Sequence, residues 1–159
     1  MIVVSDTSLL ANLALVGQID LLRQLYGQVF IPPAVQVEIA AAHTEQTDAI
    51  GKLSWIEGHA VANQLLVRSL QLELDQGEAE AIALASELKA DILLIDERKG
   101  RAVAERLGLR FIGVLGVLVE AKHRQLIPSV RPILDNLVTK AGFWISQDLY
   151  TRVLQAVAE

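Results

Sequence analysis

The chain has 159 residues, a length that favours one domain with a full hydrophobic core. Hydrophobic residues make up 52% of it but aromatic residues only 4%, so Leu, Ile, Val and Ala must build that core. The net charge of −5 argues against a broad basic surface for non-specific binding to nucleic acid, although a few local cations can still hold a phosphate backbone. The absence of cysteine excludes disulfides and thiolate chemistry.

The apolar segments are too short for a membrane protein. None of them reaches the roughly 18–20 residues that a helix needs to cross a bilayer. The first residues also lack the basic start and the small-residue cleavage site of a secretory signal. We therefore expect a cytoplasmic protein with no membrane segment.

The first part of the chain alternates between strand and helix patterns. Strands are predicted where short β-branched or apolar runs meet a polar or Pro stop, and helices where apolar residues recur three and four apart. Gly17 is a plausible cap of the first helix, and Pro33 suits the start of a later one because its missing N–H costs nothing there. In chain order, the predicted elements are a strand over residues 1–5, helices over 7–16 and 19–26, a strand over 29–31, helices over 33–42 and 48–53, and an extended piece over 55–61.

The second part continues the alternation. Gly77 is expected to break the chain before a strong helix, and Pro128 and Pro132 are expected to open a later one. The predicted elements are helices over residues 63–70 and 78–88, a strand over 91–95, a helix over 99–107, a strand over 109–112 and a helical remainder. Such alternation predicts parallel strands with right-handed crossovers.

The expected architecture is α/β, with helices on both sides of a central, mostly parallel sheet of four to five strands. We predict one domain over residues 1–159, comprising a core over 1–125 and a C-terminal helical extension over 126–159. The extension would cover a sheet edge or pair with a second copy, and the high apolar content favours a homodimer.

Two aspartates directly follow predicted strands. Asp6 stands in VVSDTS after the first strand, and Asp96 stands in LLIDER after another. Ligands of such sheets bind at the carboxyl ends of the strands, so both carboxylates would lie at one edge if the two strands are neighbours. Like charges held close raise each other's pKa or require a cation, and oxygen ligands select Mg²⁺ or Mn²⁺. Taken singly, either Asp is as readily explained as a helix N-cap.

Three glutamates are further candidates for the same site. Glu38 lies at the edge of the buried face of its helix, and its spacing alone favours a solvated side chain. Glu78 opens a helix, where a carboxylate is also stabilised by the helix dipole. Glu80 competes with Glu78 because it is only two residues away, on a different face of the helix.

Four segments, in this order, resemble the PIN-domain family: DTSLLANLA, IPPAVQVEI, LDQGEAEAIALA and LLIDERKGRAVAERLG. The segment GVLGVLVEAKHRQLI extends the likeness. More narrowly, they resemble a branch of predicted nucleic-acid-binding proteins related to the ribonuclease toxins of type II toxin–antitoxin pairs. The resemblance implies a three-layer α/β/α PIN-like fold and cleavage of single-stranded RNA with Mg²⁺ or Mn²⁺. It also implies homodimers and, for a toxin, an antitoxin partner.

The resemblance assigns roles to particular residues. It places Asp6, Glu38, Glu78 and Asp96 in the catalytic and metal-binding set. Thr7 and Ser8 carry hydroxyls that would orient Asp6, a metal-bound water or the substrate. The chain departs from many toxin relatives after Asp96, where Glu97-Arg98-Lys99-Gly100-Arg101 replaces a second well-placed Asp and an aromatic residue. A second metal ion is therefore in doubt.

Several residues keep two interpretations. Lys99 and Arg101 either hold the phosphate backbone beside the start of their helix or are solvated surface charges. Trp55 and Trp144 are expected in the core or an interface, with base stacking as the alternative.

Competing functions are also open. A non-catalytic PIN-like module would bind nucleic acid or a protein without cutting it. A haloacid-dehalogenase-like phosphatase needs an Asp where Ser8 stands, and a phosphotransfer receiver needs paired acids near the first strand, where Ser5 precedes Asp6.

Overall fold

The computed structural model describes residues 1–159. One five-stranded sheet, with every pair parallel, forms its centre in the order β3-β2-β1-β4-β5. The strands are β1 (Val3–Ser5), β2 (Val29–Ile31), β3 (Ile56–Gly58), β4 (Ile92–Leu94) and β5 (Phe111–Ile112). The predicted α/β fold with a parallel sheet is confirmed.

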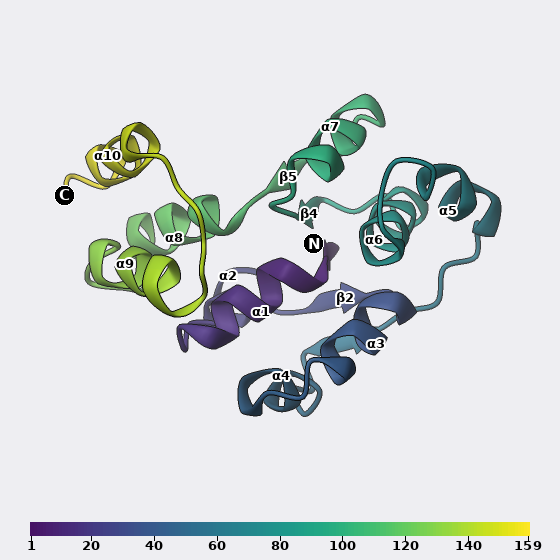
Figure 1. Ribbon diagram of the computed structural model, residues 1–159, viewed down its shortest axis with the longest axis horizontal. Helices are drawn as coiled ribbons and strands as arrows, with labels where there is room; N and C mark the ends of the chain where they lie inside the picture. The colour runs from purple at the N-terminus through teal and green to yellow at the C-terminus, as the bar shows by residue number, and fades with distance from the viewer.

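Helices join the strands and flank the sheet (Figure 1). They are α1 (Thr7–Leu15), α2 (Asp20–Tyr26), α3 (Pro33–Ala41), α4 (Glu45–Ile50), α5 (Gln64–Leu70), α6 (Gln76–Glu87), α7 (Arg98–Arg106), α8 (Val114–His123), α9 (Arg131–Lys140) and α10 (Gln147–Ala156). None of them combines the length and the apolar character that crossing a membrane requires.

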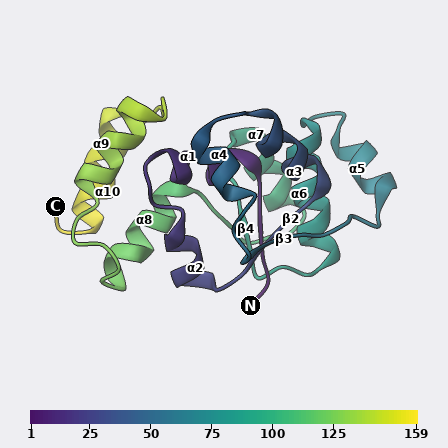
Figure 2. The ribbon, with the colours of Figure 1, turned by 90° about the horizontal axis from the view of Figure 1, so that it is seen from below.

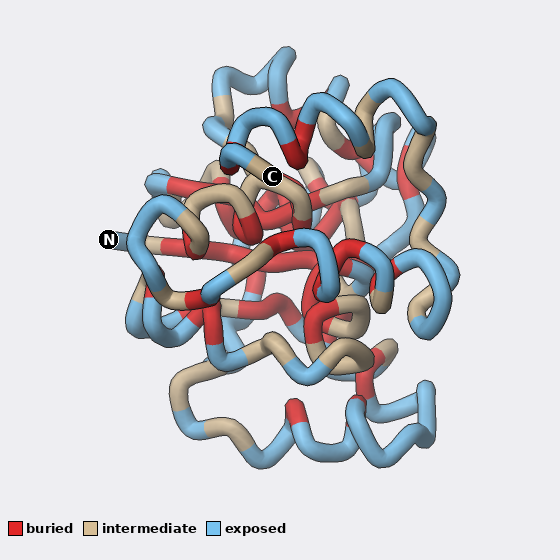
Figure 3. Tube along the Cα trace, turned by 90° about the vertical axis from the view of Figure 1, so that its left-hand side faces the viewer, coloured by how far each residue is buried: buried red, intermediate tan, exposed pale blue.

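Alternation along the strands divides the core between the two faces of the sheet. Val3 and Leu94 belong to a buried cluster with α1, α2 and α8, whereas Val4 and Leu93 belong to a second cluster with α6 and α7. Successive side chains of a strand point to opposite faces, so neighbouring residues enter different layers. Figure 3 shows the buried residues through the middle of the molecule and the exposed ones in its outer turns. The layers are therefore helix, sheet and helix.

The C-terminal helices pack on the first layer. α9 contacts α1, and α10 contacts α8. Leu134 and Leu154 join the same buried cluster as Leu10 of α1. Figure 2 shows α8, α9 and α10 grouped at one end of the molecule, with α5 at the other. A division of the chain near residue 125 stays a prediction.

Several predicted elements had wrong limits, and three of them show the physical reason. The helix expected over residues 48–53 is α4, which begins at Glu45 because Thr44, as its N-cap, forms a reciprocal capping box with Thr47 in its first turn. Gly77 does not break the chain but lies in the first turn of α6, which Asp75 caps. The strand expected over residues 109–112 is only Phe111–Ile112, since just two residues pair with β4.

Candidate functional site

The sheet order brings the two aspartates to one edge. The chain proceeds outward from β1 to β2 and β3, then returns to β4 on the other side of β1. Ser5 lies opposite Leu94, and the Asp6 N–H donates to the Leu94 carbonyl at 3.1 Å. Asp6 follows Ser5, and Asp96 lies just beyond Leu94. Both carboxylates therefore stand at the point where the strand order reverses, which is the usual ligand site of such sheets.

Asp6 serves as a helix cap and still keeps an oxygen available. Its Oδ1 accepts from the Leu9 N–H at 3.1 Å, and the residue is only 3% exposed. No hydrogen bond reaches Oδ2; since no buried side-chain oxygen of the protein lacks a partner, Oδ2 must reach solvent. Burial raises the pKa of Asp6 to about 8, and the negative charges of Asp96, Glu78 and Asp75 add to that rise. The N-cap role therefore does not exclude a role in the site.

Asp96 lies between the start of α8 and an arginine. The Val114 N–H donates to its two oxygens at 3.1 and 3.3 Å, and the Arg101 guanidinium lies 3.4 Å from Oδ1. Burial raises the pKa of Asp96, against the opposing effects of Val114 and Arg101. Gly113 permits this approach, because a Cβ there would overlap both Oδ1 of Asp96 and the guanidinium.

Arg101 and Lys99 differ in how free they are. Arg101 Nε also donates to the Ile95 carbonyl at 3.2 Å, and its guanidinium lies 5.7 Å from the centre of the Phe111 ring. The Arg101 cation thus already has partners within the protein, although its side chain is partly exposed. Lys99 is exposed and forms no ion pair. A substrate contact for either residue stays a prediction, and the geometry favours Lys99.

Glu38 is held against the start of α6. Its Oε2 accepts a hydrogen bond from the Thr7 hydroxyl, and the side chain is partly buried. Its carboxyl group packs on Gly77, where a Cβ would lie 2.7 Å from Oε2 and 2.8 Å from Cδ. The spacing had favoured a solvated side chain, which this position contradicts. The apolar spacing within α3 could not show that Gly77 of α6, which has no side chain, would leave room for the Glu38 carboxyl group.

The two candidate glutamates of α6 point to different surroundings. Glu80 is 6% exposed and accepts from the Ala34 N–H at 3.0 Å and from Gln76 Nε2 at 2.9 Å, so it caps the start of α3. Burial raises the pKa of Glu78 to about 7, and the nearby acids, first Asp75 and then Glu97 and Glu38, raise it further. Glu78 therefore lies near Asp6, Asp96 and Glu38, and we call these four carboxylates the acidic group. Glu80 does not belong to it, because its carboxylate binds the start of α3.

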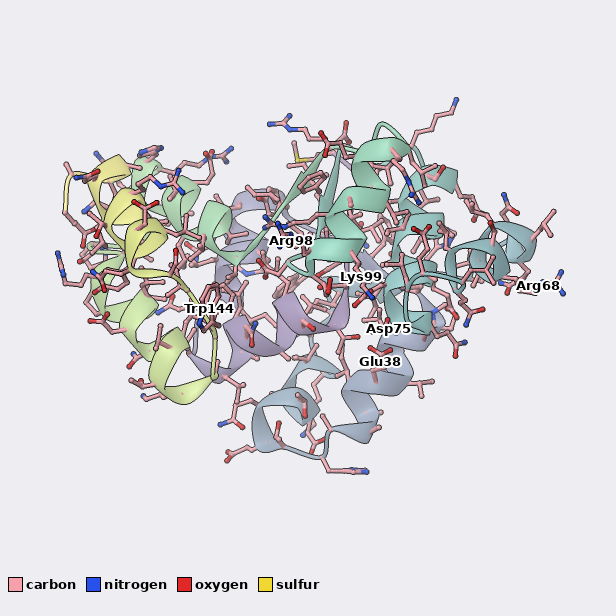
Figure 4. The ribbon with its side chains drawn as sticks, turned by 45° about the horizontal axis from the view of Figure 1, so that its top comes forward. Glu38, Arg68, Asp75, Arg98, Lys99 and Trp144 are labelled. Atoms are coloured by element: carbon pink, nitrogen blue, oxygen red, sulfur yellow. The ribbon has the colours of Figure 1, made fainter.

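Asp75 is an acid that the sequence analysis missed. It caps α6 by accepting from the Glu78 N–H at 2.8 Å, and its charge raises the pKa of both Asp6 and Glu78. The signal was the spacing of Asp75 and Glu78, which is typical of a helix N-terminus. Figure 4 shows the labelled Glu38, Asp75 and Lys99 where α3, α6 and α7 begin or face one another.

The oxygen ligands of the acidic group suit a divalent cation, but their positions in this structure do not yet form a binding site. No three His, Asp or Glu side chains lie close enough together to ligate one ion in this structure. Burial raises the pKa of Asp6 and of Glu78, and repulsion from the neighbouring carboxylates raises both further. A divalent cation relieves such repulsion, and oxygen donors suit Mg²⁺ or Mn²⁺. Ligation by three carboxylates would require their side chains to turn toward one another.

Comparison with known proteins agrees with this fold. A family described as a PIN domain matches residues 2–159, so the chain belongs to the PIN-domain family. Its structure is similar to that of a PilT N-terminus domain protein, SSO1118, from the hyperthermophilic archaeon Sulfolobus solfataricus, with a TM-score of 0.53 and 19% identity; the match covers 76% of this chain and 93% of that one. No curated protein matches the chain. PIN domains are generally nucleases and typically use divalent metal ions, so the fold is nuclease-like.

Proposed function

We propose that the chain is a Mg²⁺- or Mn²⁺-dependent endoribonuclease that hydrolyses phosphodiester bonds in single-stranded RNA. The observation that carries this proposal is the position of Asp6 and Asp96 at the carboxyl ends of adjacent parallel strands. Burial raises the pKa of both, so their charged forms are disfavoured without a counter-charge. A divalent cation supplies that charge and explains why two acids are held at one sheet edge.

The acidic residues divide the work of the site. Asp6 and Asp96 would hold the ion, with Glu38 and Glu78 as further ligands, directly or through water. When bound, the ion supplies Lewis acidity that activates water and neutralises charge on the cleaved phosphodiester. Glu38 or Glu78, where it contacts the ion only through water, would accept a proton from the attacking water. The Thr7 hydroxyl keeps Glu38 in place.

Two further residues would contact the RNA. Lys99 is exposed in the first turn of α7, where its ammonium group would meet a phosphate; the Lys99 N–H already donates to the Glu97 carboxylate that caps the helix. Ser8 is exposed in the first turn of α1, next to the acidic group. These contacts would hold the strand across the sheet edge.

Substitution of the two aspartates tests the proposal. Asp6→Asn and Asp96→Asn should each lower Mn²⁺-dependent cleavage of single-stranded RNA by a factor of about 100 or more, because even outer-shell partners of a metal commonly account for 10- to 100-fold. Asp48→Asn, which changes an exposed carboxylate of α4, is the matched control and should cut normally. Unchanged cleavage by both site variants would remove the proposal.

A non-catalytic nucleic-acid-binding module is the second candidate. It is favoured by the Arg101–Asp96 ion pair, which gives Asp96 a positive partner without a metal, and by the lack of a three-acid cluster. Calorimetric titration with Mn²⁺ separates the two functions. Binding that Asp96→Asn abolishes supports the nuclease, and no binding to the wild type supports the module.

The biological setting is part of the same proposal. We infer a cytoplasmic protein that acts as a toxin with an antitoxin partner, and a short neighbouring reading frame would support that setting. The chain also exposes large apolar side chains at Val37, Leu65 and Leu72, which favours a homodimer. A strictly monomeric mass by light scattering at micromolar concentration would contradict the dimer.

A further inference from the structure

Trp144 is an exposed tryptophan on a loop that is otherwise anchored to the protein. It lies between α9 and α10, and 83% of its surface is exposed. Its neighbours Phe143 and Ile145 pack against the core, and the Phe143 N–H donates to the Leu137 carbonyl at 3.0 Å. Because adjacent side chains of an extended segment point in opposite directions, Trp144 is turned outward. Trp144 therefore does not lie in the core, whereas a place for it in an interface stays a prediction.

The loop is fixed at both ends. Gly142 adopts a φ of +66° directly after the end of α9, a conformation that glycine takes without strain. At the other end, the Ser146 hydroxyl accepts from the Leu149 N–H at 3.1 Å and caps α10. A rigid indole presented in this way loses little conformational entropy when it binds a ligand. Its exposed apolar face also gains from being covered.

An open groove of about 450 Å³ joins Trp144 to the acidic site. Thr7, Ser8 and Asn12 line it from α1, and Asp96 lines it from the end of β4. Ser8 and Asn12 are four residues apart, so they lie on one face of the helix. Figure 4 shows Trp144 on the loop before α10, to one side of the labelled Lys99 and Asp75. A ligand in the groove therefore meets Asp96 and Trp144 together.

The groove presents three kinds of chemical group. Asp96 and Glu97 supply carboxylates, Ser8 and Asn12 offer hydroxyl and amide groups, and Trp144 offers a flat aromatic face. A nucleotide unit carries a matching set of phosphate, sugar hydroxyl and base, provided that a cation joins the phosphate to the carboxylates. Bases of a duplex are covered by their neighbours, whereas those of a single strand are free to stack on aromatic side chains.

We propose that Trp144 stacks on a base of single-stranded RNA whose neighbouring phosphodiester lies at Asp6 and Asp96. This inference rests on the proposed function and adds Trp144 and Asn12 to Lys99 and Ser8 among the residues that bind the strand. Every base has an aromatic face, so the contact selects single strands over duplexes and does not select a sequence.

Fluorescence tests the contact without RNA cleavage. Trp55, which packs against the core, is replaced in Trp55→Phe so that Trp144 is the only tryptophan. An oligouridylate of about ten nucleotides is titrated at low salt with Ca²⁺, which supplies the cation that the carboxylates need, beside a duplex RNA of the same length; gel electrophoresis confirms that the strand stays intact. The single strand should quench the emission of Trp144, and the duplex should leave it unchanged.

Affinities of variants complete the test. Trp144→Ala should weaken binding of the labelled single strand about 5- to 150-fold, the range expected for the loss of one stacked base. Trp144→Phe keeps an aromatic face and should stay within about threefold of the wild type. Leu107→Ala is the matched control, because Leu107 is 43% exposed at the end of α7 and lies outside the groove; the affinity of this variant should not change.

Failure of this inference differs from failure of the proposed function. If the single strand leaves Trp144 emission unchanged, or if Trp144→Ala binds it as tightly as the wild type, the stacking proposal is overturned. Cleavage that Asp6→Asn abolishes would then still support the nuclease. Quenching and weakened binding in a protein that never cuts RNA would support the stacking and refute the nuclease. If Trp144→Ala instead turns a dimer into a monomer with RNA affinity unchanged, Trp144 belongs to an interface and the stacking proposal also fails.

Discussion

Replacing Gly77 by Ala should weaken Mn²⁺ binding at the acidic group while changing the free energy of unfolding only slightly. The added Cβ would lie 2.7 Å from Oε2 and 2.8 Å from Cδ of Glu38, which is closer than the atoms can approach. Glu38 ends in a flexible side chain, so we expect its carboxyl group to turn away and lose the hydrogen bond from the Thr7 hydroxyl. The acidic group would then lose one of its members.

The expected change in stability is small because two effects oppose each other. Alanine in place of glycine stabilises a helix by roughly 0.5–1 kcal/mol. Loss of a hydrogen bond to a charged group costs about 1.5–3 kcal/mol, and less where water can replace it, as it can for the partly buried Glu38. The free energy of unfolding should therefore change by no more than about 2 kcal/mol. Affinity for Mn²⁺ should nevertheless fall about 10- to 100-fold.

Urea unfolding, calorimetry with Mn²⁺ and RNA cleavage together check the Gly77→Ala variant. Gly51→Ala is the matched control, since Gly51 has a φ of −62° and its added Cβ would meet only the Asp48 carbonyl oxygen at 3.6 Å. Unchanged Mn²⁺ affinity and cleavage in Gly77→Ala would show that the observed position of Glu38 is irrelevant to the site. A loss of stability above about 4 kcal/mol would show that the helix backbone, and not Glu38, takes up the clash.

Three further predictions concern single carboxylates and the ion. The folded chain retains the Asp6 proton up to a pKa of about 8, whereas an unperturbed Asp releases it near 3.8, so the wild type in EDTA should lose stability as the pH rises through that window. Asp6→Asn, which keeps a capping oxygen and has no proton to lose, should become progressively more stable than the wild type, and a constant difference in urea midpoint between pH 5 and 8 would contradict the shift. Glu80→Ala leaves the Ala34 N–H without its partner, so it should lower the free energy of unfolding by about 1–3 kcal/mol and leave Mn²⁺ affinity unchanged. Glu78→Gln should instead lower Mn²⁺ affinity and leave the free energy of unfolding nearly unchanged. Urea unfolding and calorimetry measure the two quantities. Mn²⁺ should raise the melting temperature of the wild type at neutral pH but not that of Asp6→Asn, and equal shifts in both would place the bound ion elsewhere.

Local patterns in the sequence were sufficient to predict much of the framework. The apolar runs around Val3 and Leu93 indicated buried strands, and the position of Asp6 and Asp96 directly after those runs marked them as a candidate pair at one sheet edge. The sequence was less informative about where a helix begins when a side-chain cap sets its first residue. The Thr44–Thr47 pair moved α4, because a capping box fixes where a helix begins and leaves no mark on the apolar period.

Periodicity and chain breaks act over a few residues, so they were enough to indicate which elements form and which acids follow strands. The fold was needed to see that β1 and β4 are neighbours, that Glu80 caps the start of α3 while Glu78 lies near the other acids, and that Trp144 stands beside a groove. Each of these depends on contacts between residues far apart in the chain. Such contacts are set by how sheet and helices pack, and the spacing of residues within one helix does not encode what lies across from it.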